Sequence, residues 1–387
     1  MKTSVAKLLT FFIPNKDRRH HVRDFLIHLS IGDFRSLRRF LKAETRENSV
    51  LLIETNTAHG EVIAGYLKYF QDMGFNVDVL VNPVIVKENP FCRLDLSRVS
   101  VFSSDFPLLG RFFASRKFRA YKHVFLMTSA AYFYWIGDRQ GSVLACYPKL
   151  REHPSLFVVE HDLNDIERFG EQSFLSRKHL IALGRFPHTQ AVFVSPFLFG
   201  DVRTANGDAR DGETVFICVG GIQQARKNHQ KLISAIREII AVKRNFKVVI
   251  IGKGELQNLP EEIHPFCEIT GRIDFPEMFE KLEKADFLLP LLDADEPAHN
   301  RYITTGVTGS AQLIYAFEKI PVVHPKFAAF YGFDDRNAII SGSLAQGMLA
   351  ALALDRQARE AKQMALAQLA ERLKAESTDN LKEILSR

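Results

Sequence analysis

The sequence lacks an apolar run long enough to cross a membrane. The longest one near its start, LLTFFI, has six residues and is followed by Pro14 and a basic cluster, whereas a spanning helix needs about 20 apolar residues. The same segment has no small-residue cleavage site of the kind that ends a secretory signal. We therefore expect neither a transmembrane protein nor a secreted one, but a protein of the cytoplasm.

Cysteine is scarce and scattered along the chain. The cysteines share no CxxC spacing, and no Cys/His pattern of a zinc site occurs. We expect them to be reduced, partly buried thiols, as is usual in the cytoplasm, and we expect no cofactor. They are Cys92, Cys146, Cys218 and Cys267.

Three nucleotide-binding and catalytic signatures are also missing. The chain has no GxGxxG of dinucleotide-binding folds, no GxxxxGK[ST] of P-loop proteins and no GxSxG of serine hydrolases. These absences argue against a nicotinamide or flavin enzyme, a P-loop nucleotide hydrolase and a hydrolase of the α/β type.

Positive charge is concentrated in the first 48 residues. They contain 11 Lys and Arg against 5 Asp and Glu, and so account for the whole net charge of +6. Short apolar runs alternate there with basic clusters, at the three- and four-residue spacings of amphipathic helices. The apolar residues are Leu8, Leu9, Phe11, Phe12, Ile13, Phe25, Leu26, Leu29, Phe34, Leu37, Phe40 and Leu41.

The sequence leaves two interpretations of this basic helical appendix, residues 1–48, open. A basic amphipathic helix with Phe and Leu can lie in a lipid interface, where each Lys or Arg near an anionic leaflet contributes about 1 kcal/mol. The alternative is a pair of helices packed on the body, with solvated charges. Nucleic acid is not an expected partner, because no aromatic platform is interleaved with the cluster and no second basic stripe accompanies it.

Residues 49–200 carry the alternation of a parallel α/β domain. A strand at 49–53 is followed by a helical pattern at 61–75 and a second strand at 76–81, and such strand–helix–strand units produce parallel sheets. Further strands are expected at 99–102, 123–127, 156–160 and 191–195. We therefore predict a Rossmann-like domain over this part of the chain.

Two loops of this domain are chemically rich. ETNTAHGE contains His59 and EHDLND contains His161, and each follows a predicted strand. Ligands of open parallel sheets bind at the carboxyl ends of strands, and a histidine there can act as a general base because its pKa lies near neutrality. The alternative is a structural histidine bonded to the backbone. His161 is the first catalytic candidate and His59 the second.

A second α/β pattern begins after a polar segment. Residues 200–213, GDVRTANGDARDGE, have no apolar periodicity and are typical of a linker. Strands and helices alternate again from residue 214, so a second Rossmann-like domain is expected over 214–343. Residues 344–387 are rich in Ala, Leu, Lys and Glu and predict C-terminal helices.

Three loops of the second domain suit an anionic ligand. Cations follow one predicted strand in GGIQQARKN, glycines follow the next in GKGE, and hydroxyls precede a helix in YITTGVTGS. Arginine can bind phosphate bidentately, glycine lets backbone N–H groups approach, and a helix N-terminus favours negative charge. The more ordinary interpretations are a tight turn and a helix cap. The candidate diphosphate-binding residues are Gly220, Gly221, Arg226, Lys227, Asn228, Gly252, Gly254, Thr304, Thr305, Gly306, Thr308, Gly309 and Ser310.

A carboxylate pair lies near these loops in the sequence. Asp293-Ala294-Asp295 spells DxD, a pattern that can hold Mg²⁺ on a nucleotide diphosphate. The match is short enough to arise by chance, and the same carboxylates could bind sugar or ribose hydroxyls. We expect no metal site.

The loops also carry a family resemblance. GGIQQARKNHQKLISAI resembles the "G…RKN…L…A" segment of GT-B-fold glycosyltransferases that use nucleotide sugars in bacterial lipopolysaccharide and capsule synthesis, and FKVVIIGKGE and YITTGVTGSAQLIYAFEKIPVVHP resemble the segments that follow it. The resemblance covers residues 214–325, and more loosely 49–200, while FFIPNKDRRHHVR looks like the leader of peripheral members. It implies two Rossmann-like domains facing a cleft, with the donor diphosphate on Arg226 and Lys227.

The same resemblance implies a nucleotide-sugar donor, a glycan or lipid-linked acceptor, and an enzyme that is cytoplasmic or peripheral on the inner face of the cell membrane. Relatives carry two glutamates ahead of the last strand, where this chain has Val307 and Ile314. That departure leaves the sugar and the stereochemistry open. The alternatives are a nucleotide-sugar epimerase of the same fold and a catalytically silent subunit of a glycan assembly complex.

Overall fold

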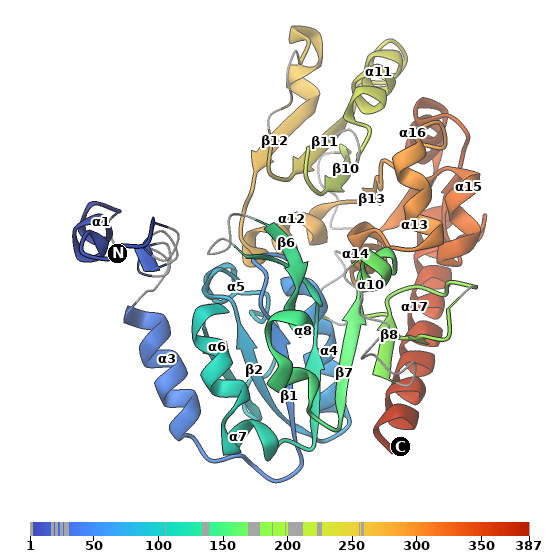
Figure 1. Cartoon of the computed structure of the whole chain (residues 1–387). Helices are drawn as coiled ribbons and strands as arrows, with labels where there is room; N and C mark the ends of the chain where they lie inside the picture. Colours follow the sequence, from blue (N-terminus) through green and yellow to red (C-terminus); the bar gives the residue numbers. More distant parts are fainter. Residues whose placement is uncertain are drawn as a thin grey trace. The chain divides into compact units, whose positions relative to one another are not determined.

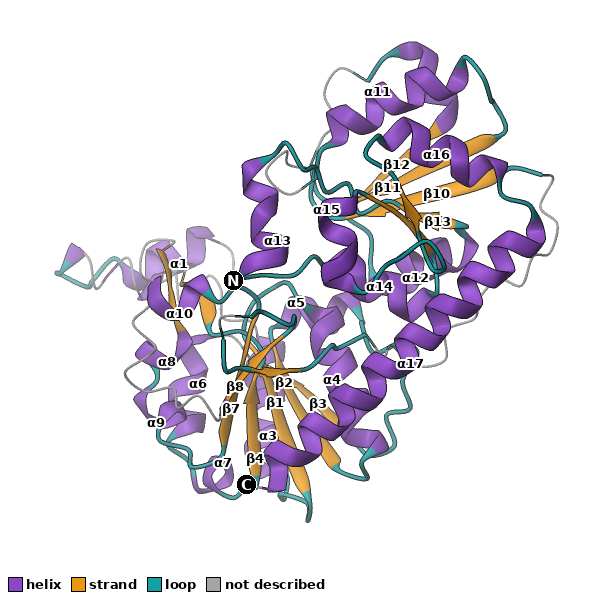
Figure 2. Cartoon of the chain, turned by 90° about the vertical axis from the view of Figure 1, so that its right-hand side faces the viewer, coloured by secondary structure: helices purple, strands orange, loops and turns teal. Residues whose placement is uncertain are grey.

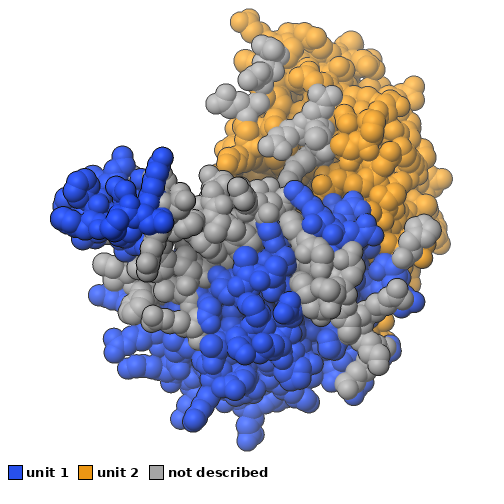
Figure 3. Space-filling view, viewed as in Figure 1, with its two compact units in different colours: residues 1–183, 189–198, 382–387 blue, residues 184–188, 199–381 orange. Residues whose placement is uncertain are grey.

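The structure is a computed structural model in which the chain forms two compact α/β units (Figures 1 and 3). Unit 1 comprises residues 1–183, 189–198 and 382–387, and unit 2 comprises residues 184–188 and 199–381. The described residues are 3–16, 19, 22–23, 26, 31–104, 106–133, 139–168, 179–187, 189–197, 199, 212–222, 227–254, 256 and 259–386. Of the predicted linker, only Gly212 and Glu213 belong to them.

Unit 1 is built on the parallel sheet that the sequence predicts. Its strands run in the order β3-β2-β1-β4-β7-β8-β9, and every neighbouring pair is parallel. The inner strands β1, β4 and β7 are buried at every residue, as expected for a parallel sheet covered on both faces. The strands are β1 Ser49–Glu54, β2 Asn76–Val81, β3 Val99–Ser103, β4 His123–Leu126, β7 Leu156–Glu160, β8 Leu180–Ala182 and β9 Val192–Phe193, and an antiparallel hairpin adds β5 Ala130–Phe133 and β6 Arg139–Ser142.

The helices of unit 1 cover this sheet (Figure 2). The first crossover helix, α4, packs on β1 and β2. At Gly65 an added Cβ would lie 2.5 Å from the carbonyl of Pro196, so only glycine allows this approach of helix and chain. Tyr69 Oη fixes the same contact by donating to Ser195 O at 2.9 Å. The helices are α4 Gly60–Asp72, α5 Pro83–Glu88, α6 Phe106–Phe113, α7 Arg116–Arg119, α8 Val143–Cys146, α9 Pro148–Arg151 and α10 Asn164–Arg168.

The predicted basic appendix behaves differently along its length. Helix α3, Ile31–Lys42, packs on β3 and α6. Its Leu37 and Phe40 are buried in the core of unit 1, and the Phe40 ring lies 4.5 Å from that of Phe102. These two apolar side chains stabilise the fold, so they are not available to lipid.

Helix α1, Thr3–Thr10, differs from α3 because most of its large apolar side chains are exposed. Phe12 is 83% exposed and Leu8 69% exposed. Large exposed apolar side chains grouped over so short a segment mark an interaction surface in most soluble proteins. We call this group the α1 patch; it consists of Val5, Leu8, Leu9, Phe11 and Phe12.

Unit 2 contains a second parallel sheet, with the order β12-β11-β10-β13-β14-β15. The chain moves outward from β10 to one edge and then from β13 to the other, so the strand order reverses between β10 and β13. Ligands of open α/β sheets bind at such a switch point, outside the carboxyl ends of the strands. The strands are β10 Thr214–Val219, β11 Phe246–Ile251, β12 Cys267–Gly271, β13 Phe287–Leu288, β14 Ile320–Val323 and β15 Ile339–Ile340.

Helices cover both faces of the second sheet. Helices α11 and α16 contact each other and bury a core of mainly Ile, Leu and Val side chains against the strands. Phe279 of α12 and Phe317 of α14 pack in an aromatic cluster that includes Phe199. The C-terminal helices lie where the sequence predicts helical structure. The helices are α11 His229–Ile240, α12 Phe275–Lys284, α13 Arg301–Thr304, α14 Gly309–Phe317, α15 Pro325–Ala328, α16 Leu344–Ala353 and α17 Arg356–Ser386, with short 3₁₀ turns at 261–266, 297–300 and 329–331. None of the described helices is long and apolar enough to span a membrane.

Candidate functional site

The two glycine turns predicted after β10 and β11 touch each other. Gly220 N donates to Ile251 O at 2.9 Å, and an added Cβ on Gly252 would lie 1.8 Å from Gly220 O. Gly220 and Gly254 have φ values of +140° and +128°, which side chains rarely tolerate. Gly221 lies beside them, where an added Cβ would be 3.8 Å from Lys253 O. The glycines are therefore required first of all by the approach of two backbone segments.

Lys227 joins these turns to the start of α14. Its side chain is buried, and its ammonium donates to Pro290 O and to Ser310 Oγ, each at 2.6 Å. The side chain passes over Gly220, where an added Cβ would lie 2.9 Å from Lys227 Cε. Burial lowers the pKa of Lys227 to about 8. A buried cation thus lies at the switch point of the second sheet, beside a helix N-terminus.

The hydroxyl-rich loop divides into two parts. Thr308 caps α14 by accepting from Ser310 N, and Gly309 begins the helix. Thr304, Thr305 and Gly306 instead close α13: the backbone N–H groups of Thr305 and Gly306 both donate to Arg301 O. Only residues 308–310 of the predicted set therefore lie at a helix N-terminus. Arg226 lies outside the described residues, and its role stays a prediction.

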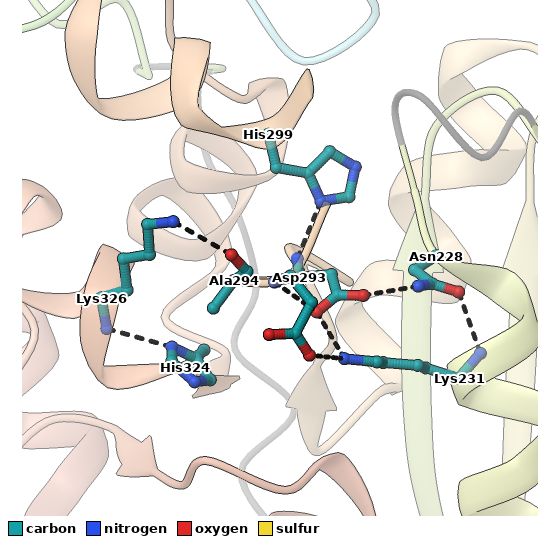
Figure 4. Close-up of polar contacts among 8 residues, drawn as sticks. Asn228, Lys231, Asp293, Ala294, His299, His324 and Lys326 are labelled. Carbon is teal, nitrogen blue, oxygen red and sulfur yellow. Dashed lines mark hydrogen bonds and ion pairs between the residues drawn. The ribbon is translucent and has the colours of Figure 1, made fainter. Parts of the chain in front are cut away.

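The carboxylates of the DxD pattern are engaged by a lysine (Figure 4). Lys231 Nζ donates to Asp293 Oδ1 at 2.5 Å and to Asp295 Oδ2 at 2.9 Å. Asn228 caps α11 by accepting from Lys231 N, and its Nδ2 donates to Asp293 Oδ2 at 2.6 Å. The predicted Asn228 is thus placed by a residue, Lys231, to which the sequence gives no role. Among the described residues no group of three or more His, Cys, Asp or Glu side chains could hold a metal ion.

In unit 1 the structure brings the two predicted histidines together. The ring centroids of His59 and His161 are 4.0 Å apart. His59 precedes α4 with a φ of +67°, an uncommon backbone conformation that turns the chain into the helix. Its Nδ1 lies 4.0 Å from Glu61 Oε1.

His161 is held as a neutral imidazole of defined orientation. Burial, and secondarily the charge of His59, lowers the pKa of His161 well below its ordinary value. Its Nε2 lies 2.9 Å from Met127 O, and because a carbonyl oxygen only accepts, Nε2 carries the hydrogen. The lone pair is then on Nδ1, so His161 has the protonation state of a general base at neutral pH.

A buried carboxyl group supports the same backbone carbonyl. Glu54 ends β1 with no exposed surface, and burial raises its pKa to about 8. Thr128 Oγ1 lies 2.6 Å from Glu54 Oε2 and 2.8 Å from Met127 O. With Glu54 protonated, its O–H can donate to Thr128 while the Thr128 hydroxyl donates to Met127 O. The sequence alone does not indicate this role of Glu54; its one signal is an acidic residue directly after an apolar strand pattern.

Part of the second unit matches a known family model. Residues 213–303 match the model described as glycosyl transferases group 1. No curated protein matches the chain in sequence.

Solved glycosyltransferases share the fold of most of the chain. A glycosyltransferase from Rickettsia africae ESF-5 has a TM-score of 0.56 at 12% identity, over 88% of this chain and 98% of that one. An α-glucosyltransferase in complex with UDP has a TM-score of 0.59 at 12% identity, over 88% and 100% of the two chains. AviGT4, a glycosyltransferase of avilamycin A biosynthesis, has a TM-score of 0.53 at 13% identity, over 87% and 98%. The predicted architecture of two Rossmann-like units is confirmed.

Proposed function

We propose that this chain, a glycosyltransferase with a group 1 domain in its second unit, transfers a sugar from a nucleoside diphosphate sugar to a surface-glycan acceptor. The observation that carries the proposal is the buried ammonium of Lys227 at Ser310, at the switch point of the second sheet. A cation at a helix N-terminus, beside glycine turns, suits a diphosphate.

The donor diphosphate would bind unit 2, on Lys227 and the first turn of α14. The Lys227 ammonium has three N–H groups, two of which donate to Pro290 O and Ser310 Oγ. A phosphate oxygen can take the third, or replace Ser310 as a partner. The α14 dipole places positive potential at Gly309 and Ser310. Arg226, one residue earlier, would add a second cation.

Departure of the nucleoside diphosphate is the step that these groups assist. Negative charge develops on the leaving diphosphate as the bond to the sugar breaks, and fixed cations and helix-terminal N–H groups stabilise that charge. His161 is proposed to act on the acceptor, either as the base that removes its hydroxyl proton or as a residue that orients it, with His59 beside it. No metal is required for either role.

The α1 patch is proposed to bind the chain to the anionic inner face of the cell membrane, where a lipid-linked acceptor would reside. Phe and Leu side chains enter the interface, and nearby lysines such as Lys7 and Lys16 attract anionic headgroups. The proposed acceptor is a surface glycan of the class that includes lipopolysaccharide, capsule and exopolysaccharide.

Incubation with radiolabelled nucleotide sugars and a lipid-linked glycan acceptor tests the proposal. We expect the label to move from one donor to the lipid fraction, and Lys227→Ala to abolish the transfer while leaving the protein folded. Val242→Ser, a change at an exposed residue of unit 2, serves as the control and should transfer at the wild-type rate. Nucleotide binding without turnover or hydrolysis of any donor would contradict the proposal and favour a silent subunit.

A further inference from the structure

A network around Asp293 ties the start of α11 to the loop that follows β13 (Figure 4). Asp293 is buried, and its carboxylate accepts from Lys231 Nζ, Asn228 Nδ2 and Asp295 N. Its own N–H donates to His299 Nδ1 at 2.8 Å. We call these five residues the Asp293 network. They come from two segments more than 60 residues apart in the chain.

The network needs the charged form of Asp293. Three donors meet its two oxygens, so an amide in its place would turn one N–H group toward another. The same donors hold the pKa of Asp293 below its ordinary value although burial opposes them. The two carboxylates in turn raise the pKa of Lys231. Asp293 and Lys231 are therefore both ionised near neutral pH.

The network reaches the candidate diphosphate site through consecutive residues. Asn228 N donates to Leu291 O at 3.2 Å, while the preceding Lys227 donates through Nζ to Pro290 O. Residues at the start of α11 are thus hydrogen-bonded to the loop at Pro290, Leu291 and Asp293. Leu291 has a φ of +55°, a conformation that a leucine keeps only when its surroundings hold it there.

We propose that Asp293 and Lys231 are positioning residues of the donor site, because they fix Asn228 and the 290–293 loop and thereby hold the Lys227 ammonium at Ser310. This inference rests on the proposed function, since it assigns Lys227 to the donor diphosphate. It also gives the DxD pattern a role without a metal: the Lys231 ammonium lies between the two carboxylates, in the place that a cation would take.

The inference predicts a loss of ligand affinity from changes that touch no ligand. Asp293→Asn removes the negative charge and places an amide N–H group opposite one of the three donors of the network. Lys231→Met removes the ammonium but keeps the length of the side chain. Lys231→Arg retains a cation that can pair with both carboxylates. The matched control is Glu268→Gln, which changes carboxylate to amide at an ion pair with Lys281 on the edge strand β12.

The test is calorimetric titration of the full chain with UDP, GDP, ADP and CDP, with thermal unfolding recorded in parallel. For the diphosphate that the wild type binds best, we expect Asp293→Asn and Lys231→Met to weaken binding by about tenfold or more. Lys231→Arg and Glu268→Gln should stay within about threefold of the wild type. Because Lys231 is half exposed, its variants should fold even where Asp293→Asn does not.

A lowered melting temperature with affinity within about twofold of the wild type would overturn the inference, because it would show a structural role alone. Failure of the proposed function has a different signature: the wild type and Glu268→Gln would bind none of the four diphosphates. In that case the donor site is wrong, and the positioning role falls with it.

Discussion

The ammonium of Lys227 donates to Ser310 Oγ over 2.6 Å, between residues 83 positions apart in the chain. One residue belongs to the turn after β10 and the other to the first turn of α14. Their contact brings together two of the three loops that the sequence marks as anion-binding. The third loop joins them through the contact of Gly252 with Gly220. The Asp293 network, which we propose to hold this arrangement in place, contacts the same loop through Asn228 N, which donates to Leu291 O.

The lowered pKa of Lys227 predicts a pH-dependent affinity for nucleoside diphosphates. With a pKa of about 8 in the folded chain, Lys227 is charged at pH 7 and loses its charge as the pH rises to 9. The diphosphate attracts only the charged form, so affinity should fall over this range, and binding near pH 8 should take up protons. Calorimetry in buffers of different ionisation enthalpy measures both effects.

The control for this prediction is Lys227→Arg, whose guanidinium stays charged at every pH used. Whatever its affinity, that variant should lack the decline between pH 7 and 9. Equal wild-type affinity at the two pH values would mean that Lys227 does not contact the diphosphate.

Glu54→Gln should increase the free energy of unfolding at high pH. Burial raises the pKa of Glu54 from 4.5 to about 8, so between these values the folded chain holds a proton that the unfolded chain releases. Its stability therefore falls as the pH rises through this window. A glutamine cannot ionise and escapes the loss, which is on the order of a few kcal/mol.

Urea unfolding at pH 5 and pH 8.5 checks this change. The stability of Glu54→Gln relative to the wild type should grow between the two pH values, whereas Glu268→Gln, at a partly buried ion pair, should show no such growth. A difference that is the same at both pH values would show that Glu54 is ionised in the folded chain. It would also exclude the donation from Glu54 to Thr128.

Local patterns predicted most of the fold because the inner strands of each sheet are continuous, mostly buried segments separated by amphipathic helices. The same patterns identified Lys227, Ser310 and both histidines, since these follow strands or begin helices. They marked Asp293 only as part of a DxD pattern, and they showed the structural role of neither Asp293 nor Glu54. The roles of those two depend on partners that lie 62 and 74 positions away in the chain, and no local periodicity encodes such pairing.

The appendix illustrates the same limit. Its two apolar stretches look alike in sequence, with Leu and Phe at helical spacing among basic residues. Only the packing of α3 against β3 and α6 shows that Leu37 and Phe40 belong to the core. The amphipathic pattern predicts that the apolar face of a helix will be covered. It does not show whether the protein core or another surface covers it.

Chelation should leave sugar transfer unaffected. The Lys231 ammonium already pairs with both Asp293 and Asp295, and Lys227 is proposed to supply the positive charge near the diphosphate. Transfer assayed after dialysis against EDTA should keep its rate to within about twofold. A large loss that Mg²⁺ or Mn²⁺ restores would show that a divalent ion takes part and that the DxD carboxylates can exchange their lysine for it.

Changing the α1 patch should release the chain from anionic liposomes. Phe11→Ser with Phe12→Ser removes two of its most exposed apolar side chains without touching the core, whereas deleting residues 2–46 would also remove Leu37 and Phe40. The fraction of the double variant that sediments with phosphatidylglycerol vesicles should be several-fold lower than that of the wild type. Neither high salt nor neutral vesicles should restore it. Val242→Ser is the matched control, and equal sedimentation of all three proteins would rule out the patch as a membrane anchor.

The central claim is that the turn before α11 holds the donor diphosphate, and one calorimetric comparison tests it most directly. Arg226→Ala combined with Lys227→Ala should weaken nucleoside diphosphate binding by about a hundredfold or more. His59→Ala and His161→Ala, in the other unit, should change it by less than about threefold. Unchanged affinity in the double variant, with either histidine variant weaker, would place the diphosphate elsewhere and contradict the account.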